Sequence, residues 1–162
     1  MFKNFGLGLL SALGFSVVAT VASACPDVRQ NGAYGYYTGN DLYTPKYFRV
    51  TAGGNNSLQR GCKSIYNKLG SDRGEGFFTD QPDFTLETPG LRGFTLVIAV
   101  TSQCDSTLLI NTPAGNWYYD DDDNGNLDAM IQLTAPSSGI LDIWVGTADG
   151  QYCDAQLRLE TF

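Results

Sequence analysis

The chain has 162 residues, of which 17 are Asp or Glu and 10 are Lys or Arg, so its formal net charge is −7. This acidic balance argues against nucleic acid or an anionic membrane as a partner, because both repel a negatively charged protein. The sequence contains no histidine, which excludes a serine-protease triad, since that mechanism needs an imidazole to accept the serine proton.

The first 24 residues have the pattern of a secretory signal. A single basic residue, Lys3, precedes an apolar run from Phe5 to Val21, and the small residues Ala22-Ser23-Ala24 follow. Removing this leader removes Lys3 and no acid, which changes the net charge from −7 to −8. Nothing after residue 24 is apolar for the ~20 residues that a spanning helix needs. We therefore expect a secreted or periplasmic protein in which residues 25–162 form a single domain.

Four cysteines remain in the exported chain, at positions 25, 62, 104 and 153. In an oxidising compartment they are expected to form two disulfides, for which three connectivities exist. We favour Cys25 with Cys62, which ties down the new N-terminus, and Cys104 with Cys153, which closes a loop around the acidic segment. Lipidation of Cys25 is an alternative, because this cysteine directly follows small residues, but it would leave an odd number of thiols.

Short β-branched and aromatic runs recur along the exported chain, with Gly, Pro, Asn and Asp between them. The predicted strands span residues 33–37, 47–51, 76–79, 84–87, 94–101, 107–111, 116–120, 129–133, 139–145 and 155–160. Both alternating faces of residues 94–101 are largely apolar, which is typical of a central strand. The pattern predicts an all-β protein, an antiparallel β-sandwich of jelly-roll type that is crosslinked by disulfides.

The run from Asp120 to Asp128, DDDDNGNLD, is the most distinctive segment of the chain. Side chains that carry oxygen occupy loop positions 1, 3, 5, 7 and 9, and Gly125 stands at position 6, as in the calcium loops of EF-hands. The match is incomplete, because position 12 is Ile131 and the flanking residues have strand character. We therefore predict a calcium site in a β-loop and not an EF-hand. A solvated acidic turn is the alternative.

Alternation along an extended segment places successive side chains on opposite sides. On this basis the expected calcium ligands are Asp105, Asp120, Asp122, Asn124 and Asp128. Residues Asp121, Asp123 and Asn126 form a second rank. Paired carboxylates could also hydrolyse glycosides, but adjacent acids raise one another's pKa unless a cation neutralises them. An oxygen-only ligand set suits a hard cation such as calcium.

Residues 104–122, followed by the strand GILDIWVGT at 139–147, resemble the bacterial pre-peptidase C-terminal domain family. The shared features are an Asp before an apolar strand, a turn with Gly, a strand that ends in paired acids and a late Gly-rich aromatic strand. The resemblance implies a small secreted β-sandwich that binds calcium and adheres to a substrate or matrix. It does not imply proteolysis.

Tyrosines in the N-terminal part offer a second candidate site. We expect Tyr36, Tyr37 and Tyr43 to stack on a ligand if they are exposed, and to pack in the sheet otherwise. Together these features predict a non-catalytic calcium-binding module whose partner is an extracellular protein or polysaccharide. One alternative is an extracellular hydrolase or a peptidase-associated protein, and the other is a structural subunit of a surface layer or filament. The sequence leaves the oligomeric state open.

Overall fold

A computed structural model describes residues 25–162, so the predicted signal peptide, residues 1–24, lies outside the described residues. Every strand expected from the sequence is present, with ends shifted by one or two residues. The strand that sequence patterns missed is β3, whose two residues are too short to show a period. The strands are β1 Ala33–Tyr36, β2 Lys46–Ala52, β3 Asn56–Ser57, β4 Phe77–Phe78, β5 Phe84–Thr88, β6 Thr95–Ser102, β7 Ser106–Asn111, β8 Trp117–Asp120, β9 Met130–Thr134, β10 Gly139–Thr147 and β11 Cys153–Thr161. One α-helical turn, α1 Lys63–Tyr66, and two 3-10 turns, η1 Asp41–Tyr43 and η2 Leu91–Gly93, are the helical elements of the same residues.

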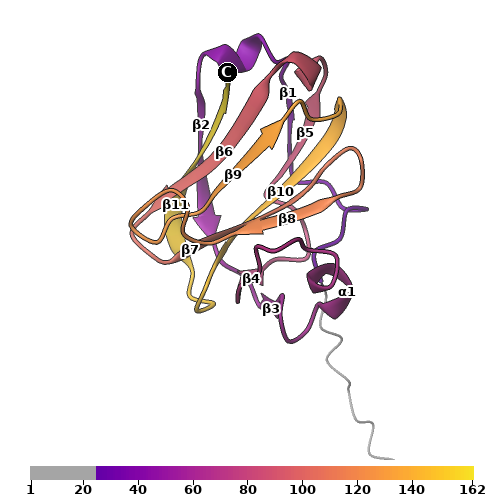
Figure 1. The fold of residues 1–162 in the computed structure, drawn as a ribbon. Helices are drawn as coiled ribbons and strands as arrows, with labels where there is room; N and C mark the ends of the chain where they lie inside the picture. Colours follow the sequence, from indigo (N-terminus) through magenta and orange to yellow (C-terminus); the bar gives the residue numbers. More distant parts are fainter. Residues whose placement is uncertain (1–24) are drawn as a thin grey trace, which may run out of the picture.

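The strands form two sheets that pack face to face (Figure 1). The small sheet has the order β2-β11-β6-β9, with β6 inside it as its two apolar faces predict. In the large sheet β10 is the central strand, because it pairs with β5, β7 and β4. The all-β sandwich is thus confirmed. One pair departs from the antiparallel expectation, since β1 runs parallel to β5, and the large sheet is mixed.

The main core lies between the two sheets. Residues at every second position of β6 point into it, and they meet the inward residues of β7 and β10. Leu96, Ile98 and Val100 are at most 1% exposed, as are Leu108 and Ile110 of the facing sheet. Complete burial of such side chains stabilises the fold by about 1.5–3 kcal/mol each.

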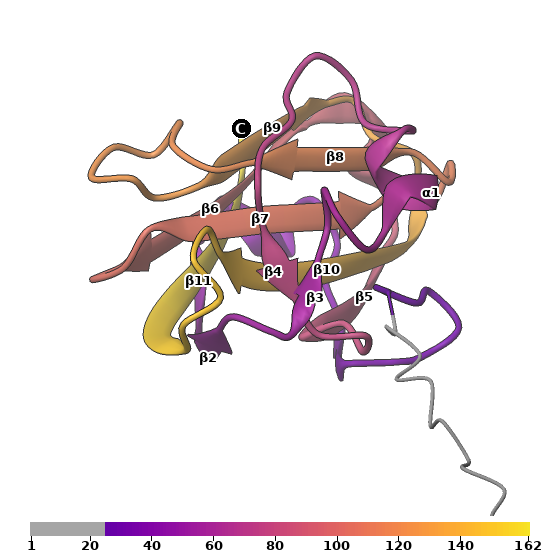
Figure 2. The same ribbon diagram turned by 90° about the horizontal axis from the view of Figure 1, so that it is seen from below.

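A second, smaller core covers the outer face of the large sheet. Trp117 and Trp144 pack together there with ring centroids 5.4 Å apart, under α1 and the segment that precedes β4. Figure 2 shows α1, β3 and β4 lying over β7, β8 and β10. This second core covers the outward face of β10, where Trp144 lies. When both faces of a sheet are buried, its central strand needs apolar residues at successive positions, and β10 has them.

Both disulfides have the connectivity that the sequence favoured. Cys25 bonds to Cys62 inside the second core, and Cys104 bonds to Cys153 between the β6–β7 loop and the start of β11. Because the sulfur of Cys25 is held in a disulfide, it is not free to carry a lipid thioether. Disulfides persist outside the reducing cytoplasm, and the protein is accordingly secreted or periplasmic.

Candidate metal centre at the acidic edge

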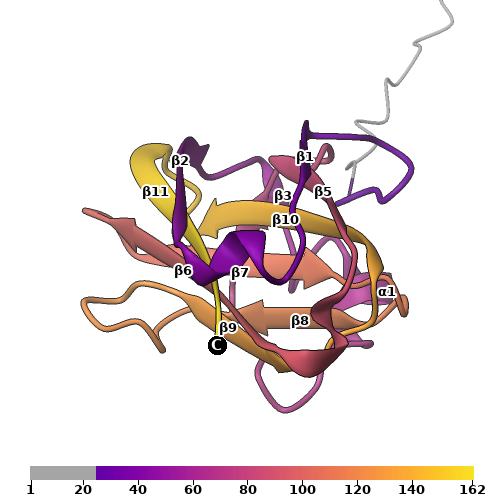
Figure 3. The same cartoon turned by 90° about the horizontal axis from the view of Figure 1, so that it is seen from above.

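The acidic segment connects β8 of the large sheet to β9 of the small sheet. It projects from one end of the sandwich beside the β6–β7 loop (Figure 3). The two acids at its ends are buried, with Asp120 2% and Asp128 3% exposed, whereas Asp122 and Asp123 between them are exposed. The loop is therefore fastened at both ends and open in the middle.

Asp120 fastens the first end of the loop. One oxygen of its carboxylate accepts hydrogen bonds from the backbone N–H groups of Asp123, at 3.2 Å, and Met130, at 2.7 Å. The first of these bonds closes the turn and the second reaches the first residue of β9. The second carboxylate oxygen is not used by these two contacts, so Asp120 can still bind a cation.

Asp128 fastens the other end. Its carboxylate accepts hydrogen bonds from the hydroxyl groups of Ser102 at 2.7 Å and Ser106 at 2.9 Å, and from the backbone N–H of Ser102 at 3.2 Å. Ser102 ends β6 and Ser106 begins β7, so one carboxylate links the two sheets. Both of its oxygens have protein partners, and this gives Asp128 a structural role with or without a metal.

Three consecutive residues at the tip adopt the left-handed conformation. Gly125 has φ +75°, as the predicted sharp turn requires, and Asn126 and Leu127 follow with φ +54° and +62°. Asn tolerates this region, but a leucine is strained in it. The carboxamide N–H of Asn124 donates to the carbonyl of Val100, which orients this side chain toward β6.

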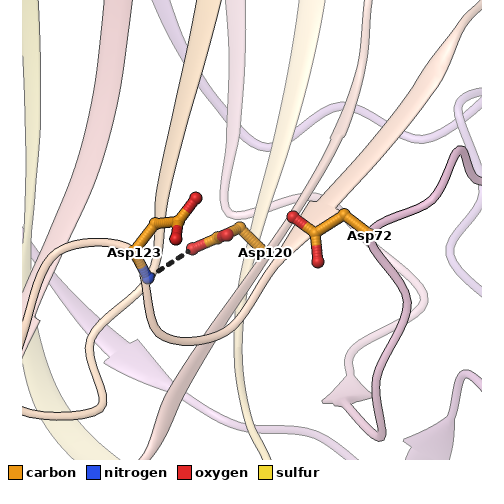
Figure 4. A group of neighbouring side chains, drawn as sticks. All are labelled: Asp72, Asp120 and Asp123. Atoms are coloured by element: carbon orange, nitrogen blue, oxygen red, sulfur yellow. Dashed lines mark hydrogen bonds between the residues drawn. The ribbon is translucent and has the colours of Figure 1, made fainter.

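Three carboxylates come together at the base of the loop. One oxygen each of Asp72, Asp120 and Asp123 lies within 4.8 Å of the other two. Figure 4 shows the Asp120 carboxylate between those of Asp72 and Asp123. Asp72 comes from the connection between α1 and β4 and is exposed, like Asp123. Oxygen ligands at this spacing suit a hard divalent cation.

The sequence did not single out Asp72, because it lies 48 positions before Asp120 as an isolated acid between Ser71 and Arg73. No local pattern could have identified it. Of the five expected ligands, only Asp120 belongs to the three-carboxylate group found among residues 25–162. Asp105 and Asp122 are exposed and lie outside this group. Asp123, placed in the second rank of expected ligands, belongs to it.

Unbalanced negative charge accumulates at this end of the molecule. Burial raises the pKa of Asp120 to about 6, and the charge of Asp123 adds to the effect. The pKa of the exposed Asp105 is also raised, first by some loss of hydration and then by repulsion from Asp149, Asp122 and Asp128. A cation would relieve this repulsion and hold the carboxylates in their ionised form.

The expected stacking tyrosines differ in their surroundings. Tyr36 and Tyr43 are 55% and 61% exposed. Tyr37, in contrast, is partly buried and packs edge-on against Phe48 with ring centroids 6.0 Å apart. Tyr37 therefore packs against the main core and is not an open stacking surface.

No protein-family model and no curated protein matches this sequence. Among solved structures, the chain is similar to PliG of Aeromonas hydrophila, a periplasmic lysozyme inhibitor of g-type lysozyme, with 10% sequence identity and a TM-score of 0.47. The alignment covers 82% of this chain and 99% of that chain. Identity this low carries no information about function. Within residues 25–162 there is no helix whose length and apolar character would let it cross a membrane.

Proposed function

We propose that this protein is an exported, non-catalytic binding module whose acidic edge is held together by calcium, and whose partner is an extracellular protein or polysaccharide. The convergence of Asp72, Asp120 and Asp123 supports the metal. Asp72 comes from the α1–β4 connection, whereas Asp120 ends β8 and Asp123 lies in the loop that follows it. A cation bound between them would tie the α1–β4 connection to the β8–β9 loop.

Calcium fits the donor set better than a softer metal. The group offers only carboxylate oxygens, and the sequence provides no imidazole. Calcium accepts six to eight oxygen ligands in flexible geometry, so backbone carbonyls and water can complete its coordination around three carboxylates. Sites of this kind in extracellular modules bind with Kd values of about 10⁻⁴ to 10⁻³ M.

Hydrolytic activity is the second candidate function, because one observation favours it. A carboxyl with a pKa of about 6 next to another carboxylate is the arrangement of a general acid and its partner in glycosidases. However, the cleft of about 930 Å³ in this structure is lined by residues of the small sheet and by none of the three acids. The acid pair therefore has no substrate cleft around it in this cavity, and we favour the metal.

The metal is tested by thermal unfolding of residues 25–162 with calcium from 0 to 10 mM, with magnesium as the control cation and with a chelator. Binding to the folded form alone raises the midpoint by mass action, by about 2.7 kcal/mol of stability at one hundred times Kd. We expect a saturable increase for calcium that the chelator reverses. An unchanged midpoint would remove calcium from the proposal.

The module function is tested separately. Incubation with casein and with polysaccharides should release no product, and release that disappears in Asp120→Asn would establish a hydrolase instead. Light scattering against concentration tests the third reading, a structural subunit, since such a protein assembles as it is concentrated.

A further inference from the structure

The outer face of the small sheet is hollowed into a cleft of about 930 Å³ at the end where β2, β11 and β6 run side by side. Its polar lining comes from all three strands and from the β6–β7 loop. Gln156 on β11 lies opposite Arg49 on one side and Thr101 on the other, and Asp154 lies opposite Thr51. The β6–β7 loop contributes Gln103. The exposed polar side chains of the lining are thus Arg49, Thr51, Thr101, Gln103, Asp154 and Gln156.

These six side chains form no hydrogen bond or ion pair with any other residue in the range 25–162. Elsewhere in the same range an exposed arginine does pair, as Arg29 does with Asp27. The set contains one guanidinium, one carboxylate, two carboxamides and two hydroxyls. The cleft is therefore close to neutral in a protein whose exported form carries a net charge of −8. Its volume falls within the ~300–1,000 Å³ of small-ligand sites.

We propose that this cleft binds a neutral oligosaccharide, which names the partner class of the binding module proposed above and rests on that function. Planar guanidinium, carboxylate and carboxamide groups can each bond two neighbouring hydroxyl groups of a sugar ring, as donors, as acceptors or as both. A polyanionic ligand would find only one cationic side chain here, Arg49, and a polycationic ligand would find only one anionic side chain, Asp154. The charges of the cleft therefore favour a neutral ligand.

An aromatic surface lies next to these polar groups. Tyr47 is 58% exposed and stands two residues before Arg49 on β2, so it is on the same face of the sheet. Opposite it, Arg158 forms an ion pair with Glu160 on its own strand. An exposed phenol ring offers an apolar face for the C–H side of a sugar and a hydroxyl at its rim.

An extended peptide fits the cleft less well. Strand β11, which forms the floor, is hydrogen-bonded to β2 on one side and to β6 on the other. The backbone N–H and C=O groups of β11 already form hydrogen bonds to these two neighbours, so a peptide could not pair with β11 as a further strand. Recognition on the floor of the cleft must therefore come from side chains, which favours a ligand that carries its own dense array of hydroxyl groups.

The cleft is also held rigid at its rim. Cys153 and Ser102 line it. The first is bonded to Cys104, and the hydroxyl of the second donates to Asp128 at the base of the acidic loop. A site whose walls are fixed before binding loses less conformational entropy when the ligand arrives.

The test uses isothermal titration of residues 25–162 with a panel of hexasaccharides from cellulose, chitin, xylan, starch and β-1,3-glucan. Oligogalacturonate is the anionic probe and a casein digest is the peptide probe. We expect at least one neutral hexasaccharide to bind in the micromolar to millimolar range. Arg49→Ala, Gln156→Ala and Tyr47→Ala should each weaken that binding tenfold or more.

Matched control variants are available on other surfaces. Arg92→Ala removes an exposed arginine at η2, and Tyr118→Ala removes an exposed tyrosine from β8 of the large sheet. Neither should change sugar binding, and circular dichroism checks that every variant folds. Binding that survives Arg49→Ala and Tyr47→Ala would place the sugar elsewhere and overturn the assignment.

The other outcomes are equally decisive. If no neutral sugar binds at 10 mM, or if only casein peptides or oligogalacturonate bind and lose affinity in the Arg49 variant, the carbohydrate assignment is wrong. The calcium-dependent melting described above is measured on the same samples. A calcium response without sugar binding would leave the metal in place and refute only the cleft, whereas loss of both would refute the proposed function as well.

Discussion

The carboxylate of Asp120, at the end of β8, accepts a hydrogen bond of 2.7 Å from the backbone N–H of Met130, at the start of β9. The two residues are ten positions apart and belong to different sheets. The acidic loop is thus part of the connection between the layers of the sandwich, and changes in it should alter stability as well as metal binding.

The two candidate ligand sets predict different effects of single substitutions. If calcium is bound by the group that the structure assembles, Asp72→Asn should weaken calcium about tenfold, or ~1.4 kcal/mol, and reduce the calcium-dependent rise in the unfolding midpoint. Asp105→Asn, an equally exposed acid outside the group, should leave this rise unchanged. The reverse result would favour the set expected from the loop pattern.

Asp123→Asn should affect the calcium-free protein in the opposite direction. Removing one of three neighbouring negative charges relieves repulsion, so the midpoint in chelator should rise while the response to calcium falls. Differential scanning calorimetry with and without calcium measures both effects on one variant. A midpoint in chelator that falls would contradict this account of the acidic edge.

Asp128 should contribute to stability without calcium. Asp128→Ala removes the acceptor of the Ser106 hydroxyl and leaves the Ser102 hydroxyl with only the carbonyl of Cys104, at a position that is 3% exposed. The expected cost is about 2–3 kcal/mol of unfolding free energy, measured by urea denaturation in chelator. Asp122→Ala, at an exposed position of the same loop, should stay within about 0.5 kcal/mol of the unchanged protein. Equal effects would show that Asp128 has no structural role.

Asp83 should make stability depend on pH. Burial raises the pKa of its carboxyl to about 6, although the backbone N–H of Val145 donates to it at 2.7 Å and acts in the opposite sense. The folded state therefore holds this proton more tightly than the unfolded chain does. The stabilisation is complete below pH ~4 and is lost as the pH rises through about 6, with a magnitude of about 1–3 kcal/mol.

In Asp83→Asn the group no longer titrates, and the amide oxygen can still accept from Val145. The difference in unfolding free energy between the variant and the unchanged protein should grow in favour of the variant from pH 4 to pH 7. Taking this difference cancels the contribution of Asp142, whose pKa is also raised by burial. If the unfolding free energies of the variant and the unchanged protein change in parallel with pH, the pKa of Asp83 is the same in the folded and unfolded states, and the prediction is wrong.

The chain packs closely against β4 at Gly54, and a substitution there can be compared with the same substitution at Gly70, which has open space around it. At Gly54 an added Cβ would lie 2.0 Å from the backbone carbonyl carbon of Phe78, which cannot move aside without shifting the strand. Gly54→Ala should therefore destabilise the fold by about 3 kcal/mol or more, because overpacking that involves backbone exceeds the usual 1–3 kcal/mol. At Gly70 there is open space, and Gly70→Ala should have no measurable cost in the same denaturation experiment. Similar midpoints for both would contradict the packing described.

Much of the fold follows from local chemistry that the sequence displays directly. The alternation of residues 94–101 and the successive apolar positions of β10 fix which strands are buried on both faces, because side chains of a strand point to opposite sides in turn. The four cysteines of an exported chain indicate two crosslinks. Gly125 marks the sharp turn of the acidic loop, where its φ is +75°.

Tertiary structure alone decided which side chains meet across long separations in sequence. Asp72 joins Asp120 and Asp123 because the α1–β4 connection covers the large sheet, and nothing in its local sequence marks it as a ligand. The polar cleft likewise exists only because β2, β11 and β6 lie in register, bringing Arg49, Gln156 and Thr101 into one row. Local patterns report the face on which a residue lies, whereas convergence depends on strand order and register, which a single strand's sequence does not contain.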